Sequence, residues 1–167
     1  ITDDAGGAAD LRVLDIGTGS GCIAISLALA LRWPEVEAFD ISAEALAVAK
    51  ENAASLKAKV DYVQTDILTA VPEADSLDVV VSNPPYICDS ERADMERNVL
   101  EHEPATALFV PDADPLLFYR AIAKYAAVAL KPAGRIYLEI NRRFGSETCQ
   151  LLEEIGFEKA QVIRDQF

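Results

Sequence analysis

The feature that most constrains the fold is a glycine-spaced turn between an expected strand and an expected helix. Leu11 to Ile16 is a short apolar run, Gly17 to Gly21 reads G-T-G-S-G, and apolar residues then recur at helical spacing up to Leu31. Glycines at alternate positions let the backbone turn tightly and approach a ligand where a Cβ would collide. The pattern therefore predicts a strand, a ligand-binding turn and a helix.

Strands and helices continue to alternate along the rest of the chain. Further strands are expected at 36–41, 60–65, 77–82, 135–140 and 157–163, and helices at 43–56, 116–130 and 146–155. The unbroken apolar character of 77–82 is typical of a strand covered on both faces. This order predicts an α/β fold, a mostly parallel twisted sheet with helices on both faces. Residues 1–10 have linker composition, so one domain is expected over 11–167.

Polar residues stand at the ends of four successive expected strands. Asp15, Asp40, Asp66 and Asn83 each fall at or just before a strand exit. The carboxyl ends of parallel strands share one edge of the sheet, where ligands bind in such folds. Asp40 can accept hydrogen bonds from both hydroxyls of a ribose. Asp66 precedes an apolar pair and equally fits a cap for the next short segment.

The motif Asn83-Pro84-Pro85-Tyr86 follows the expected strand 77–82 and indicates a particular chemistry. Each proline keeps the residue before it extended and lacks an N–H, so the Asn83 side chain and the Pro84 carbonyl are offered as acceptors. Two acceptors beside an aromatic ring suit a planar NH2 group. Tyr86 also fits simple packing at the sheet edge.

Charge and composition limit the partners. The 15 Lys and Arg against 28 Asp and Glu give a net charge of −13, which disfavours nucleic acid or anionic lipid as a main partner. Three scattered cysteines argue against disulfides and structural zinc and suit a reducing compartment. His102 is the only histidine, so a Ser-His-Asp triad would have a single candidate for its histidine. One histidine also rules out a multi-histidine metal site, and no bound metal is expected. We expect a cytoplasmic protein without a membrane segment.

Two cofactor classes use a glycine turn of this kind. The dinucleotide fingerprint G-x-G-x-x-G/A is matched imperfectly, because Gly21 comes one position early and Cys22 takes the last place. Hydride transfer also needs no acceptor pair for an NH2 group. The sulfonium of S-adenosylmethionine suits an acidic edge, so this cofactor is expected.

At this point the sequence resembles the release factor glutamine methyltransferase family, a branch of the class I S-adenosylmethionine-dependent methyltransferases with a Rossmann-like fold. This family methylates the side-chain amide nitrogen of the glutamine in the Gly-Gly-Gln motif of peptide chain release factors. The resemblance covers nearly the whole chain and rests on residues 14–25, 40–46, 81–87, Glu103-Pro104, 107–109, 118–120 and 138–140.

The resemblance implies a role for each part of the motifs. Gly17 to Gly21 would wrap the methionine part, Asp40 would hold the ribose, and Ile67 would lie beside the adenine. The expected cofactor-binding residues are Asp15, Gly17, Thr18, Gly19, Ser20, Gly21, Asp40, Ile41, Asp66, Ile67 and Asn83; the expected catalytic residues are Asn83, Pro84 and Tyr86, with Pro85 joining them in substrate binding. The product would be S-adenosylhomocysteine.

Further expectations concern the binding partners and the domains that the sequence contains. Peptide chain release factors would be the protein partners of a monomeric enzyme, without direct contact to nucleic acid or membrane. The helical N-terminal domain of the family and its final antiparallel strand are not recognisable in this sequence. The acidic stretch 89–103 fits a solvated loop or helix, or a mobile lid over the substrate.

Two other functions compete with this interpretation. The same acceptor pair could hold the exocyclic amine of a flipped adenine or cytosine, although such an enzyme needs a basic face. A catalytically silent domain that binds the cofactor or a partner protein is the other alternative.

Overall fold

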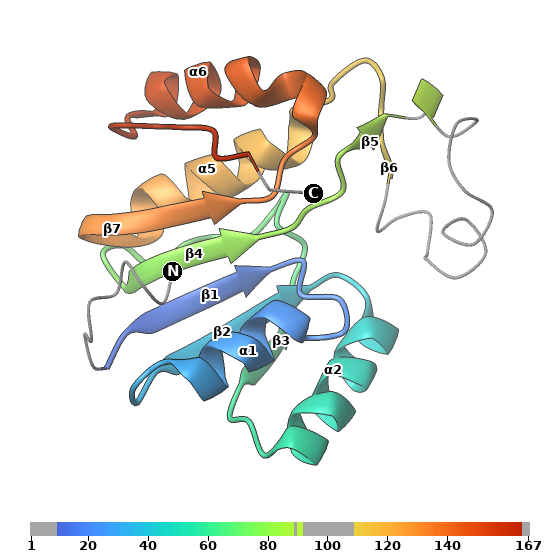
Figure 1. Cartoon of the computed structure of the whole chain (residues 1–167), viewed down its shortest axis with the longest axis vertical. Coiled ribbons are helices and arrows are strands. Elements are labelled where there is room, and N and C mark those ends of the chain that lie inside the picture. Colours follow the sequence, from blue (N-terminus) through green and yellow to red (C-terminus); the bar gives the residue numbers. More distant parts are fainter. Residues whose placement is uncertain (1–9, 89, 92–108, 165–167) are drawn as a thin grey trace.

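A computed structural model describes residues 10–88, 90, 91 and 109–164 (Figure 1). Its main sheet contains five strands, in chain order β1 (Arg12–Ile16), β2 (Glu35–Asp40), β3 (Asp61–Gln64), β4 (Leu77–Ser82) and β7 (Leu130–Leu138). All neighbours pair in parallel, in the spatial order β3-β2-β1-β4-β7. The order reverses between β1 and β4, so both of these strands deliver their carboxyl ends to the middle of one edge.

Helices lie on both sides of this sheet (Figure 1). They are α1 (Cys22–Ala30), α2 (Ala43–Leu56), α5 (Leu117–Ala129) and α6 (Gly145–Ile155). The α/β fold expected from the alternation is therefore confirmed. None of the helices in the described ranges is both long and apolar enough to cross a bilayer.

Side-chain alternation along the strands builds a core on each face. Leu14 and Ile16 of β1 pack with Ile122 of α5, whereas Val13 packs with Ala24 of α1 on the opposite face. Each of these side chains is almost fully buried. Because both faces are covered at the centre of the sheet, β4 is largely apolar and buried, as the sequence indicated for 77–82.

The prediction of a strand at 157–163 was wrong. The described residues 157–164 form no strand, and β7 is the last strand of the sheet on that side among the residues that the structure describes. Gly156 ends α6 in the left-handed conformation, and Lys159 again has positive φ, so the chain turns instead of extending. Phe157 packs against the α5 core, while Val162 lies close to Gly145 at the start of α6. An extended segment without a neighbouring strand has no partners for its backbone groups.

Three smaller elements were not expected. The two-residue strands β5 (Ile87–Cys88) and β6 (Phe109–Val110) pair in parallel, and a 3-10 helix, η2 (Arg142–Phe144), precedes α6. β7 begins at Leu130 rather than 135 and ends at Leu138, which leaves Glu139 beyond the strand. The expectations for 1–9, for most of the acidic stretch, and for His102, Glu103-Pro104 and 107–108 lie outside the described residues.

Candidate active site

The glycine turn has the tight geometry that the sequence predicted. Gly17, Gly19 and Gly21 all have positive φ, of 72°, 56° and 84°. A Cβ on Gly21 would lie 3.0 Å from the Cβ of Ala49 and 3.1 Å from the Tyr62 hydroxyl, so this glycine lets α1 pack against α2. A Cβ on Gly19 would meet no atom within 4 Å. Gly19 therefore faces open space, where a ligand can approach the backbone.

Backbone donors of the turn are largely used within the protein. The N–H groups of Gly17 and Thr18 both donate to the Phe39 carbonyl, and the Gly21 N–H donates to the Thr18 carbonyl. The Gly19 N–H donates to Asp40 Oδ2 at 2.8 Å. A pyrophosphate needs such donors turned toward it. The turn is thus a poor phosphate cradle, which favours a ligand recognised by acceptors and by shape.

The buried side chain of Asp15 supports this turn by hydrogen bonds. Its side chain is fully buried, and Oδ2 accepts hydrogen bonds from Thr18 Oγ1 at 2.7 Å and from the Ala24 N–H at 3.1 Å. Oδ1 has no hydrogen-bond partner in the described part of the chain. Burial, and to a lesser extent the nearby Asp40 carboxylate, raises the pKa of Asp15 to about 6. Direct contact between Asp15 and a cofactor stays a prediction.

Asp40 is better placed for a ligand because it is the last residue of β2 and only partly buried. Oδ2 accepts from Gly19, and Oδ1 accepts from the Ser42 N–H at 2.9 Å. Each carboxylate oxygen has a second lone pair that a ribose hydroxyl can use. The neighbouring Ile41 is 60% exposed and adds apolar surface to the same edge.

Asp66 makes the capping contacts that the sequence offered as one of its two roles. Its Oδ1 accepts the Leu68 N–H at 2.9 Å, and its carbonyl accepts from the N–H groups of Thr69 and Ala70. It therefore caps the turn after β3. Ile67 is partly buried and packs against the α5 core. Contacts of Asp66 and Ile67 with an adenine remain predictions.

The Asn83–Tyr86 segment, called the clamp below, begins where β4 ends. Ser82 is buried and donates from Oγ to the Ile16 carbonyl at 2.6 Å, which joins the ends of β1 and β4. Asn83 is exposed, and its carbonyl would lie 3.9 Å from a Cβ on Gly17. The clamp and the glycine turn are therefore neighbours. Within the described chain, no donor bonds the Asn83 side chain or the Pro84 carbonyl.

The Tyr86 ring is held by a carboxylate at the end of β7. The hydroxyl donates to Glu139 Oε1 at 3.0 Å. Burial, and then this hydrogen bond, raise the pKa of Tyr86, so the phenol stays neutral around pH 7. Glu139 was part of a motif that carried the family resemblance, but the sequence assigned it no role.

Asn141 was missed altogether in the sequence. Its side-chain amide donates to the Tyr86 carbonyl at 3.0 Å and to Glu91 Oε2 at 3.2 Å. Glu91 also accepts from the Cys88 N–H and from Arg143. The Arg143 bond, followed by the Cys88 bond, lowers the pKa of Glu91. No local pattern marks an asparagine for such contacts.

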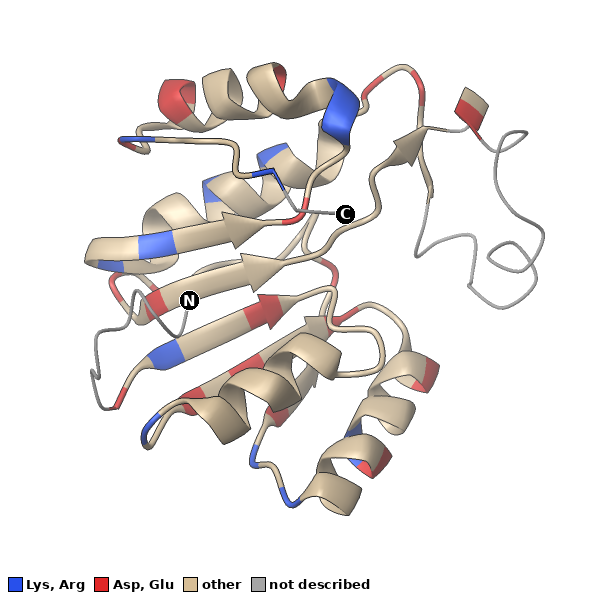
Figure 2. Cartoon of the chain, viewed as in Figure 1, with Lys and Arg blue, Asp and Glu red and all other residues tan. Residues whose placement is uncertain are grey.

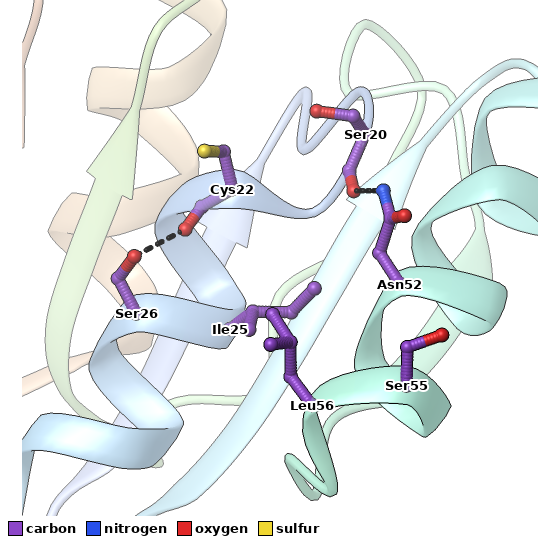
Figure 3. A pocket seen from close by; sticks show the side chains of 7 residues that line it. All are labelled: Ser20, Cys22, Ile25, Ser26, Asn52, Ser55 and Leu56. Carbon is purple, nitrogen blue, oxygen red and sulfur yellow. Dashed lines mark hydrogen bonds between the residues drawn. The ribbon is translucent and has the colours of Figure 1, made fainter.

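A separate pocket lies between α1 and α2 (Figure 3). Its volume is about 370 Å³, and the exposed Cys22 is on its wall. The other residues that line it are Ser20, Ile25, Ser26, Asn52, Ser55 and Leu56. Only Ser20 belongs to the glycine turn, so this pocket is not the expected cofactor site.

The acceptor-rich edge fits the cofactor expected from the sequence. The turn is open beside Gly19, a partly exposed carboxylate stands at Asp40, and the clamp begins at Asn83, whose backbone carbonyl lies beside Gly17. Acidic and acceptor groups suit a cation with ribose hydroxyls.

Comparison with known proteins agrees with this geometry. The sequence model of the methyltransferase small domain matches residues 5–107. The chain belongs to this family. A release factor glutamine methyltransferase from Bacteroides thetaiotaomicron is 48% identical over 157 residues, which are 93% of this chain and 56% of that relative. One from Flavobacterium psychrophilum is 45% identical over 156 residues, 93% of this chain and 55% of the relative.

These matches confirm the family resemblance read from the sequence motifs. The chain spans just over half the length of these curated relatives. A solved ribosomal protein L11 methylase from Lactobacillus delbrueckii subsp. bulgaricus has a TM-score of 0.67 at 22% identity, covering 98% of this chain and 69% of that structure. That likeness concerns the fold alone, and it confirms the class I methyltransferase architecture of this methyltransferase-family chain.

Proposed function

We propose that this chain carries the catalytic part of a release factor glutamine methyltransferase. It would transfer a methyl group from S-adenosylmethionine to the side-chain amide nitrogen of the glutamine in the Gly-Gly-Gln motif of peptide chain release factors. The observation that carries the proposal is the clamp itself, which begins beside Gly17 and whose acceptors, the Asn83 side chain and the Pro84 carbonyl, have no donors within the described chain. The names of relatives that are 45–48% identical support the same substrate.

The glycine turn and the ends of β1, β2 and β3 would hold the cofactor. Gly19 offers room for close approach, and Asp40 offers acceptors for the ribose hydroxyls. Ile41 and Ile67 offer apolar surface for the adenine. When bound, S-adenosylmethionine supplies an electrophilic methyl group on a positively charged sulfur.

The clamp would act mainly by positioning, because an amide nitrogen is a poor nucleophile. Asn83 Oδ1 and the Pro84 carbonyl would each accept one N–H of the glutamine amide. The nitrogen is then held with its lone pair directed at the methyl carbon, and such orientation can lower a barrier by up to about 7–11 kcal/mol. Both acceptors interact more strongly as the nitrogen becomes positive, so they favour the transition state over the ground state. After the methyl group has moved from sulfur to nitrogen, the nitrogen would lose a proton to water or a nearby carboxylate.

A methyl-transfer assay tests the proposal directly. The purified protein is incubated with S-adenosylmethionine and one of three substrates: a release factor, the same factor with its motif glutamine replaced by alanine, or duplex and single-stranded DNA. Mass spectrometry should find one added methyl group on the motif glutamine of the first substrate only. Methylated DNA would favour the base-amine alternative. Cofactor binding without transfer to any substrate would favour the silent scaffold.

A further inference from the structure

Asn141 stands at a junction of four segments close to the clamp. It follows β7 and precedes η2, and its own N–H donates to the hydroxyl of Tyr119, a residue of α5 that is only 1% exposed. Its side-chain oxygen accepts the Arg143 N–H at 2.9 Å. The side-chain nitrogen contacts the Tyr86 carbonyl and Glu91. Every polar group of this side chain is therefore engaged.

The chemistry of these contacts requires an amide. The oxygen faces a backbone donor, whereas the nitrogen faces two oxygens, a carbonyl and a carboxylate. Only a group with an acceptor on one side and two N–H donors on the other satisfies this arrangement. Aspartate has the same shape but no donor when ionised.

The clamp depends on such outside contacts because of its own composition. Pro84 and Pro85 have no N–H with which to bond the sheet. Two polar groups of Tyr86 are held by residues just after β7: the hydroxyl by Glu139 and the carbonyl by Asn141. The Asn141 bond acts on the backbone itself. It therefore fixes the course of the chain immediately after the two acceptors.

We propose that Asn141 is a positioning residue for methyl transfer. It holds the Tyr86 carbonyl and so sets the spacing between the Asn83 side chain and the Pro84 carbonyl. The catalytic consequence rests on the function proposed above, whereas the effect on the clamp does not.

Asn141→Asp tests this with little change of shape. The variant keeps the acceptor for the Arg143 N–H but places a carboxylate oxygen against the Tyr86 carbonyl and Glu91. We expect kcat with a release factor to fall about 10- to 100-fold. Affinity for S-adenosylhomocysteine, measured by calorimetry, should stay within about twofold, because the residues expected to hold the cofactor, apart from Asn83, lie at the ends of β1, β2 and β3.

A matched control is Gln150→Glu. Gln150 on α6 is exposed and donates to Glu154 Oε1 at 2.8 Å, so the exchange also turns an amide donor into a carboxylate that faces a carboxylate. It should leave kcat unchanged. Asn141→Ala removes the two donors without adding charge, and it serves for the same measurements if the aspartate variant does not fold.

A spectroscopic measurement separates this proposal from the proposed function. With [ζ-13C]tyrosine, the Tyr86 signal is assigned by Tyr86→Phe and followed in wild type and variants. In folded Asn141→Asp we expect it to move toward the position of an exposed tyrosine. A Tyr86 signal that stays in place, or an unchanged kcat in the folded variant, overturns the proposal. If wild type methylates no release factor, the proposed function fails, and the Tyr86 signal alone still decides whether Asn141 holds the clamp.

Discussion

The free energy of unfolding of Asp15→Asn, relative to that of the wild type, should increase as pH rises. Burial, the main cause, raises the pKa of this carboxyl from 3.8 to about 6. The folded chain then binds the proton more tightly than the unfolded chain, so the contribution to stability is complete below 3.8 and is lost as pH rises through 6. At about 1.36 kcal/mol per pKa unit, the loss reaches about 3 kcal/mol at pH 8, and roughly half of it arises between pH 5 and 8.

The asparagine side chain preserves most of the local contacts. Its oxygen can accept from Thr18 Oγ1 and the Ala24 N–H, as Asp15 Oδ2 does. Its NH2 group takes the place of Oδ1, which already lacks a partner among the described residues. A buried donor without a partner costs about 1–3 kcal/mol, but this term does not change with pH. The slope against pH therefore isolates the carboxylate.

Urea unfolding followed by circular dichroism at pH 5, 6, 7 and 8 measures this slope. The free energy of unfolding of Asp15→Asn minus that of wild type should increase by about 1.5 kcal/mol over the range. Glu51→Gln, on the exposed surface of α2, is the control and should give a nearly constant difference. A difference for Asp15→Asn that is flat, or that decreases with pH, would refute the assignment of a costly buried carboxylate.

Three further substitutions test separate parts of the site. Asn83→Ala should lower kcat by about 10²–10³-fold with S-adenosylhomocysteine affinity nearly unchanged; full turnover would remove the clamp argument. Asp40→Ala should weaken that affinity by at least about tenfold in calorimetry, and unchanged affinity would count against the ribose role. Gly21→Ala should lower the free energy of unfolding by about 1–3 kcal/mol, because φ is +84° and the new Cβ crowds Ala49; an unchanged urea midpoint would contradict this.

Local sequence signals were enough for most elements and caps. Ser42 directly precedes α2 and is a favoured N-cap residue, and its hydroxyl accepts the Ala45 N–H at 3.1 Å. Gly156 directly follows α6 and ends that helix in the left-handed conformation. Such caps depend on residues within one turn, so a single stretch of sequence contains the information.

Contacts between distant segments had no such signal. The amide of Asn141 bonds groups 55 and 50 positions earlier in the chain, at Tyr86 and Glu91. The prediction of a strand at 157–163 failed for a related reason. Val162 and Ile163 are residues common in strands, but they have no neighbouring strand within the described residues. A strand is defined by its partners, and these are not a property of the segment itself.

Position within a strand explains why Asp15 and Asp40 differ in exposure. Asp15 lies inside β1, one residue before its end, and its side chain is buried with the α1 face; Asp40 is the last residue of β2 and stays partly exposed. The sequence placed both on one edge because each stands near a strand exit. Asp15 pairs with Ala38, so Asp40 points to the same face of the sheet but lies two residues farther toward the carboxyl edge. This distance along the strand, rather than the face, separates a support for the turn from the predicted ligand-binding group.

Charge distinguishes the two kinds of methyl acceptor that the clamp alone could hold, a glutamine amide and the exocyclic amine of a base. Asp40 contributes to the raised pKa of Asp15, so the field of one carboxylate reaches the other across the glycine turn. A sulfonium is attracted by this field, whereas the phosphates of a nucleic acid are repelled by it and by the net charge of −13. In Figure 2, lysines and arginines are scattered over several elements rather than gathered along the sheet edge. A base amine would have to overcome this repulsion to reach Asn83, whereas a glutamine on a protein loop would not.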